Sequence, residues 1–149
     1  MTAPASPAPA ALAPAYGPPI SLDQAKAVMA AAEAEARANG WPMVIAIFDS
    51  GANLVMLERM DNTQLGSIQI AQGKAATAVK FRRPTKAFQD QIAAGGQNLR
   101  VLAMEDVTPL EGGMPLTQNG LIIGAIGVSG MTSAQDAQVG EAGARALMV

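Results

Sequence analysis

The stretch Glu111–Gly130, EGGMPLTQNGLIIGAIGVSG, constrains the fold of this chain more than any other segment. Within it, Asn119-Gly120 stands between two apolar runs, and this dipeptide tolerates the positive φ angles that a tight type I′ hairpin requires. The run after the turn, Leu121–Ser129, is rich in β-branched residues and too apolar to lie exposed, which indicates a central strand. We therefore expect an antiparallel sheet built around this hairpin.

The other elements follow from hydrophobic spacing and from helix and turn signals. Helices are expected over 22–39, from a cap at Ser67 to about Lys80, over 85–92, and after a cap at Ser133 with Asp136 at the third helical position. Strands are expected over 43–48 and 54–59. Leu99–Met104 fits either a short helical turn or an edge strand. The order α-β-β-α-α-β-β-α predicts an α+β domain with helices packed on an antiparallel sheet. Gly124, Gly127 and Gly130 are expected to admit a closely packed helix rather than to bind phosphate.

Residues 1–19 are rich in alanine and proline, a composition that forms no helix and buries little apolar surface. We expect a disordered or extended tail here, followed by a single domain over residues 20–149. The tail lacks the basic and long apolar regions of a signal peptide. It is similar to the start of an exported mature protein, which favours a periplasmic or exported location; a cytoplasmic tail is the alternative.

The chain contains no cysteine and no histidine. This excludes thiol nucleophiles, disulfides, zinc fingers, imidazole bases and haem ligation by histidine, and we predict no metal site. An aromatic content of 3% and a net charge of −2 argue against nucleic acid as a partner. No apolar run approaches the ~20 residues of a membrane span.

Lys74 lies among small and apolar residues on an alanine-rich predicted helix, so on a buried face its ammonium needs an anionic partner. Glu111 is the partner we expect, beside the paired glycines Gly112 and Gly113, whose backbone can approach a ligand closely. The alternative is a lysine whose stem is buried and whose ammonium reaches solvent.

Two further charged groups are candidate ligand-binding residues. Arg59 and Asp61 are two positions apart, so they point the same way if the strand continues, and they either pair with each other or present a guanidinium to an anion. Arg82 and Arg83 belong to a basic cluster around Pro84 that fits carboxylate binding, a solvated patch or a subunit contact.

As a set, several segments resemble one family, the GlcG/HbpS-like haem-binding proteins, also described as haem-degrading. The likeness covers nearly all of the chain after residue 19. The matching segments are VIAIFDSG at 44–51, LERMD at 57–61, GKA at 73–75, TA at 77–78, FRRPT at 81–85, EGGMPL at 111–116, GAIGVSG at 124–130 and QD at 135–136.

The resemblance implies a profilin-like or PAS-like fold with a five-stranded antiparallel sheet. It also implies a homo-oligomer, often an octamer, with ligands bound near subunit contacts, and haem as a ligand in some relatives. This chain departs from the family at Asn62, where a glycine is usual, and in having no histidine to ligate haem iron.

Three functions are compatible with these residues. The first is a protein that binds haem or another small anionic ligand. The second is a cofactor-free enzyme acting on a small carboxylate or carbonyl compound, with Lys74 and Glu111 as acid and base and the N–H groups of Gly112 and Gly113 as an oxyanion site. The third is an accessory oligomer without small-molecule chemistry.

Overall fold

The computed structural model describes residues 12–147 and confirms the α+β class. The helical and extended elements follow the predicted order, with one added 3₁₀ segment, η1. They are α1 (Leu22–Asn39), β1 (Val44–Asp49), β2 (Leu54–Arg59), α2 (Ser67–Phe81), α3 (Lys86–Ala94), η1 (Gly96–Ala103), β3 (Gly113–Gln118), β4 (Leu121–Ser129) and α4 (Ser133–Arg145).

The described strands form one antiparallel sheet of four strands in the order β2-β1-β4-β3. The expected hairpin joins β3 to β4, and Asn119 and Gly120 have φ angles of 52° and 77°, as a type I′ turn requires. The expectation of five strands is therefore wrong for the described residues. The ambiguous segment Leu99–Met104 lies mostly in η1, so it adds no edge strand.

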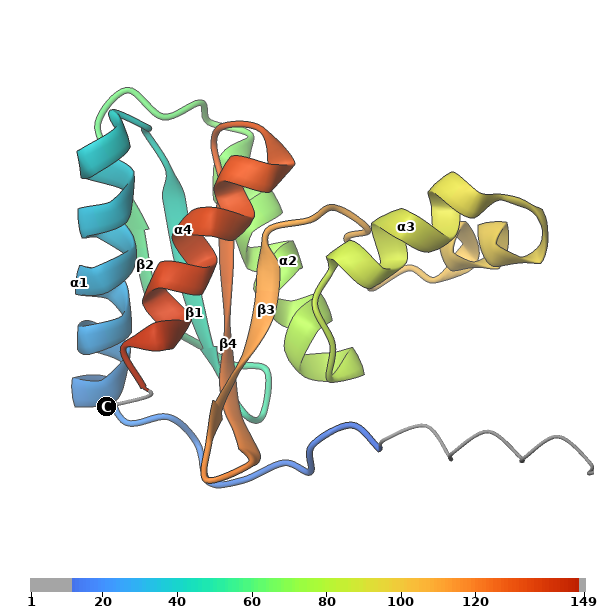
Figure 1. Cartoon of the computed structure of the whole chain (residues 1–149), viewed down its shortest axis with the longest axis horizontal. Helices are drawn as coiled ribbons and strands as arrows, with labels where there is room; N and C mark the ends of the chain where they lie inside the picture. The colour runs from blue at the N-terminus through green and yellow to red at the C-terminus, as the bar shows by residue number, and fades with distance from the viewer. Residues whose placement is uncertain (1–11, 148–149) are drawn as a thin grey trace, which may run out of the picture.

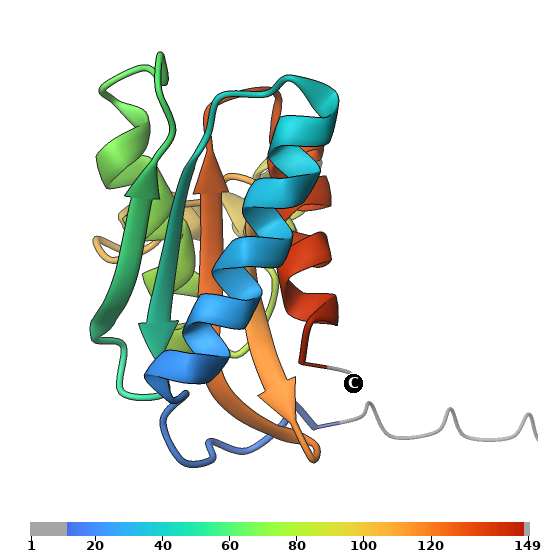
Figure 2. The same ribbon diagram turned by 90° about the vertical axis from the view of Figure 1, so that its left-hand side faces the viewer.

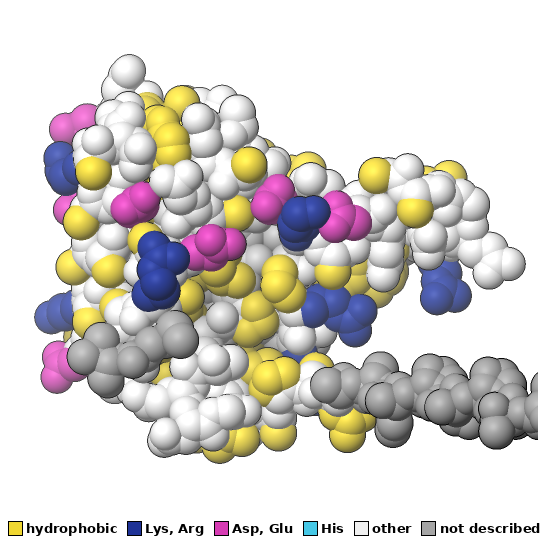
Figure 3. All heavy atoms as spheres, viewed as in Figure 1, with side chains coloured by type: hydrophobic (Ala, Val, Ile, Leu, Met, Phe, Trp, Pro, Cys, Tyr) yellow, Lys and Arg dark blue, Asp and Glu magenta, His cyan; other side chains and the backbone are white. Residues whose placement is uncertain are grey.

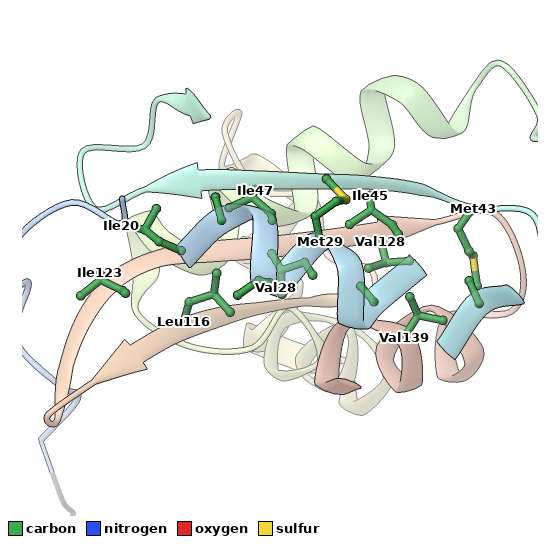
Figure 4. Close-up of a cluster of buried hydrophobic side chains, with 14 residues drawn as sticks. Ile20, Val28, Met29, Met43, Ile45, Ile47, Leu116, Ile123, Val128 and Val139 are labelled. Atoms are coloured by element: carbon green, nitrogen blue, oxygen red, sulfur yellow. The ribbon is translucent and has the colours of Figure 1, made fainter. Parts of the chain in front are cut away.

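Helices cover both faces of the sheet (Figure 2). The first face packs against α1 and α4 around residues such as Val28, Ile45, Ile126 and Val139, which lie in the core cluster of Figure 4. The second face packs against α2, where Ala71 and Ala75 meet the apolar side chains of β1. The helices therefore form one layer on each face of the sheet, with α1 and α4 on the first face and α2 on the second.

Gly127 explains how α2 comes so close to the sheet. A Cβ atom at Gly127 would collide with the carbonyl oxygen of Ala71 and with the backbone nitrogen of Ala75. This confirms the predicted role of the glycine spacing in β4, at least at this position, because only a residue without a side chain leaves room for the helix backbone.

Two helix starts differ from the expectation. Thr132, not Ser133, is the N-cap of α4, and its side chain accepts a hydrogen bond from the Gln135 N–H in a capping box. Ser67 is the first residue of α2 rather than its cap, and its hydroxyl instead bonds the Ser129 hydroxyl at 2.9 Å.

The expected N-terminal tail is partly held against the sheet. Residues 1–11 lie outside the described residues, but Tyr16 forms a parallel bridge with Ile122 of β4. The Ile122 N–H donates to Ala15 at 2.8 Å, and the Gly17 N–H donates to Ile122 at 2.8 Å. Pro14, Pro18 and Pro19 have no N–H to donate, so the pairing remains a single bridge rather than a fifth strand.

Residues 86–110, which we call the arm, extend away from the layered body (Figure 1). The arm begins with α3, folds back through η1 and returns to β3. Four large apolar side chains are exposed on it: Leu99, Leu102, Met104 and Leu110. None of the helices in the described part of the chain is both long and apolar enough to cross a membrane.

Candidate functional site

A small cavity lies where the arm joins the body, between the start of β3 and the outer side of α4. Its volume is about 180 Å³. Figure 3 shows charged side chains of both signs gathered at this junction. The lining residues are Pro84, Lys86, Glu111, Gly112, Gly113, Met114, Ala137 and Glu141. We call this cavity the Gly112 pocket.

Bonds to neighbouring elements hold the backbone of this pocket in place. Thr85 and Gly113 are joined twice, by the Thr85 N–H to the Gly113 oxygen at 3.0 Å and by the Gly113 N–H to Thr85 Oγ1 at 2.9 Å. The Val128 N–H donates to the Gly112 oxygen at 3.0 Å, and the Glu111 N–H donates to Gln89 Oε1 at 2.9 Å. The pocket wall is therefore preformed.

Gly112 is required by both conformation and space. Its φ is 133°, a region that side chains rarely adopt. A Cβ there would lie 2.7 Å from Lys74 Nζ and 2.8 Å from the Val128 oxygen. The predicted meeting of a helix-borne ammonium with the diglycine is thus present in the structure.

Lys74 is 2% exposed, so the alternative of a lysine reaching solvent is wrong. The prediction that Glu111 pairs with Lys74 is also wrong. Lys74 Nζ donates to Asp136 Oδ2 at 2.9 Å and to the Val128 oxygen at 2.8 Å. The second carboxylate oxygen of Asp136 accepts the Met131 N–H at 3.0 Å. In the sequence, Asp136 stands in the first turn of the helix expected after Ser133, where a carboxylate fits a helix start. Its place in the turn that follows a strongly apolar strand was the available signal.

Burial shifts both members of this pair toward their neutral forms. It lowers the pKa of Lys74, and the charge of Asp136 offsets part of that effect. It raises the pKa of Asp136, against the opposing influence of the Lys74 charge and the Met131 N–H. Each group depends on the other for its charge, so losing either one would leave an uncompensated buried charge.

The remaining charged groups at the pocket are more exposed. Glu111 is half-buried, and its charge supports Lys74 less strongly than Asp136 does. Lys86 Nζ pairs with Asp90 Oδ2 at 2.8 Å, and this contact raises the pKa of Lys86. Glu141 adds a second carboxylate. The pocket is therefore lined by two carboxylates and one ammonium, with Lys74 behind the glycine wall.

This geometry does not support the enzyme hypothesis. Two Lys74 hydrogen bonds are committed to Asp136 and Val128, and the Gly113 N–H is committed to Thr85. A general acid or base must reach the proton that it transfers, and an oxyanion site needs donors directed at the developing charge. Lys74 and Gly113 thus hold the pocket together rather than face a substrate.

The structure does not bring the four other candidate residues into the Gly112 pocket. Asp61 lines a separate cavity, and Arg59 and Asp61 line an adjoining smaller one, without an ion pair between them among the described residues. The guanidinium carbon of Arg82 lies 5.8 Å from the centre of the Tyr16 ring. The corresponding carbon of Arg83 lies 5.5 Å from that of Phe88. Both arginines contact aromatic rings of their own chain.

The fold and the pocket together define a small α+β protein with a preformed cavity at the base of a hairpin. Comparison with known sequences makes this specific: the chain belongs to the family described as haem degrading protein HbpS-like, whose model matches residues 20–145. The family resemblance inferred from the sequence motifs is confirmed.

Individual relatives agree with this assignment. The chain is 42% identical to the protein GlcG of Escherichia coli K12 over 110 residues, covering 74% of this chain and 81% of that protein. Its structure is similar to that of HbpS, with a TM-score of 0.80, 28% identity and coverage of 88% and 92% of the two chains. It is also similar to the structure of a PduOC:haem complex, with a TM-score of 0.78, 26% identity and coverage of 86% and 94%.

Proposed function

We propose that this protein binds a small molecule in the Gly112 pocket. The observation that carries the proposal is a preformed cavity of about 180 Å³ whose wall is held by the buried Lys74–Asp136 pair. A pocket fixed before binding lowers the entropic cost of holding a ligand. The carboxylates of Glu111 and Glu141 and the ammonium of Lys86 supply the polar contacts, and Met114 and Ala137 supply apolar surface.

The pocket size and charge restrict the ligand. Cavities that bind drug-sized ligands usually measure about 300–1,000 Å³, so the Gly112 pocket fits a compound of only a few heavy atoms. Lys86 can meet a carboxylate of the ligand, as the expectation of an anionic ligand requires. The two carboxylates of the pocket require hydroxyl or ammonium donors on the same ligand. A small hydroxy acid carries both a carboxylate for Lys86 and a hydroxyl for the two glutamates.

The test is a thermal-shift panel of small hydroxy acids, simple carboxylates and diols. A compound that binds only the native state raises the midpoint of unfolding. Ala137→Leu fills the pocket and should abolish the shift, whereas Ala134→Leu places the same side chain on the exposed face of α4 and should preserve it. A shift retained in Ala137→Leu, or no shift with any member of the panel, contradicts the proposal.

Haem binding is a second candidate, because a structural relative forms a complex with haem. The Gly112 pocket itself does not fit haem: it is too small for a porphyrin, and the chain has no histidine or cysteine to ligate iron. Any haem would lie outside this pocket, on the surface or between copies. Titration with haemin tests this: a saturable Soret shift that Ala137→Leu leaves unchanged supports a separate haem surface, and no shift removes the candidate.

We further infer that the arm mediates self-association, as expected for a homo-oligomer. Leu99, Leu102 and Met104 are 44%, 65% and 37% exposed on a projecting segment, where isolated chains would leave them in water. Light scattering after size-exclusion chromatography gives the subunit count. Leu102→Lys should lower the apparent mass, whereas Leu22→Lys, on the exposed side of α1, should not; equal masses for Leu102→Lys and the unaltered protein contradict this inference.

A further inference from the structure

The carboxyl end of α1 and the end of β2 lie at the opposite end of α1 from the N-terminal segment (Figure 1). Residues that follow these two elements line a second cavity. Its volume is about 360 Å³, twice that of the Gly112 pocket, and the two cavities share no lining residue. It is lined by Arg37, Gly40, Trp41, Pro42, Met60, Asp61 and Asn62. We call it the Trp41 pocket.

Two charged side chains, Arg37 and Asp61, line the Trp41 pocket. Arg37 is already paired, with its Nε 3.3 Å from Glu33 Oε2. The Asp61 carboxylate is exposed and has no ion pair or hydrogen bond with any of the residues from 12 to 147. The Asp61 charge, which has no partner among these residues, therefore lines the same cavity as the only tryptophan of the chain.

The end of α1 adds to this negative potential. Gly40, which caps α1 with a φ of 69°, lines the pocket, so the cavity lies at the carboxyl end of an 18-residue helix. The negative end of the helix dipole attracts positive charge.

Trp41 supplies the remaining element of a cation site. The face of an indole ring attracts ammonium groups through its quadrupole, most strongly among the aromatic side chains. Met60 and Pro42 extend the apolar wall on which the methyl or methylene groups of such a ligand can lie. No group of three acidic side chains suitable for a metal ion occurs among the described residues, so a single organic charge fits better than a metal cation.

We propose that the Trp41 pocket binds a small organic ammonium ion, held between the Trp41 indole and the Asp61 carboxylate. The site is independent of the proposed function of the Gly112 pocket. Asn62 also lines the cavity, where its carboxamide is available to a ligand.

Fluorescence of Trp41 tests the proposal directly, because no second tryptophan contributes to the emission. The probes are choline, ethylammonium and 3,3-dimethylbutan-1-ol, the last being the uncharged analogue of choline in shape. We expect a saturable change in emission with both ammonium ions at constant ionic strength and none with the alcohol. Equal binding of the alcohol, or no saturable change with either ammonium, would overturn the proposal.

Two substitutions identify the carboxylate. Asp61→Asn keeps the shape of an exposed side chain and should weaken choline binding roughly tenfold or more. Asp106→Asn makes the same change at an exposed position on the arm and should leave binding unchanged. Glu111→Gln separates this site from the Gly112 pocket and should also have no effect. Unaltered binding by Asp61→Asn, or an equal loss in Glu111→Gln, contradicts the assignment.

Discussion

Lys74 and Asp136 are 62 residues apart in the chain, yet Lys74 Nζ lies 2.9 Å from Asp136 Oδ2 in the protein interior. The pair joins α2 to the first turn of α4, and the Val128 carbonyl connects it to β4. It also fills the space that a side chain at Gly112 would occupy. The stability of the fold and the shape of the Gly112 pocket therefore depend on the same contact.

Breaking this pair should be costly. Lys74→Met leaves the Asp136 charge buried without its partner, so we expect the free energy of unfolding to fall by about 3–5 kcal/mol. Urea denaturation followed by circular dichroism measures the change. Lys86→Met breaks an exposed ion pair and should have little effect.

The double variant Lys74→Met/Asp136→Leu removes both charges and should recover part of the loss. The single variants Lys74→Met and Asp136→Leu complete the comparison. If the double variant loses as much free energy of unfolding as the two single variants together, the two groups do not interact.

Gly112 should tolerate alanine poorly. Its φ of 133° and the 2.7 Å approach to Lys74 Nζ predict that Gly112→Ala lowers the free energy of unfolding by at least ~2 kcal/mol. Gly66 is a matched control, because its φ is −59° and no atom lies within 4 Å of an added Cβ. Gly66→Ala should be neutral or stabilising by about 0.4–1 kcal/mol. Similar losses at both positions would contradict this account.

Glu58 should make stability depend on pH. Burial and the neighbouring Glu33 raise the pKa of Glu58 above its ordinary value of 4.5. The folded state then binds the proton more tightly than the unfolded state, so this stabilisation is complete below pH 4.5 and is lost as the pH rises through the raised pKa.

Glu58→Gln should accordingly stabilise the protein at pH 7 and change little at pH 4, as measured by urea denaturation at both values. Glu105→Gln, at an exposed position, serves as the control and should show no such difference between the two pH values. A Glu58→Gln effect that is the same at pH 4 and pH 7 would rule out titration of Glu58 as its cause.

Tyr16 should anchor the N-terminal segment. Its hydroxyl donates to the Val79 carbonyl at 2.7 Å, so Tyr16→Phe should cost about 0.5–1.5 kcal/mol and speed hydrogen exchange at the Ile122 amide. Leu12 lies in the same segment and is 94% exposed. Leu12→Ala should therefore change neither the free energy of unfolding nor the exchange rate of the Ile122 amide. Unchanged exchange in Tyr16→Phe would show that the segment is held without this bond.

Local features explain the parts of the fold that could be predicted. The Asn119-Gly120 turn and the Ser21 cap with Gln24 at the third helical position use interactions within a few residues, so the sequence alone indicates them. Gly127 shows the limit of local reasoning. Its spacing indicates a close approach, and the identity of the approaching atoms depends on where α2 lies.

The candidate site was predictable only in part, for the same reason. A lysine among alanines indicates that a buried anion is needed, but sequence cannot choose between Glu111 and Asp136, because that choice depends on how α4 packs after β4. The contact between Arg82 and the Tyr16 ring could not be predicted either, because the two residues are more than sixty positions apart and no local pattern connects them.

By itself, the sequence determined the α+β class, the hairpin, the family and the absence of histidine and cysteine chemistry, because these follow from composition and from contacts close along the chain. Only the tertiary structure decided the partner of Lys74, the separation of Asp61 from the Gly112 pocket and the count of four strands over residues 12–147. Those outcomes depend on packing between distant elements, where several pairings satisfy the same local pattern and the whole fold selects one.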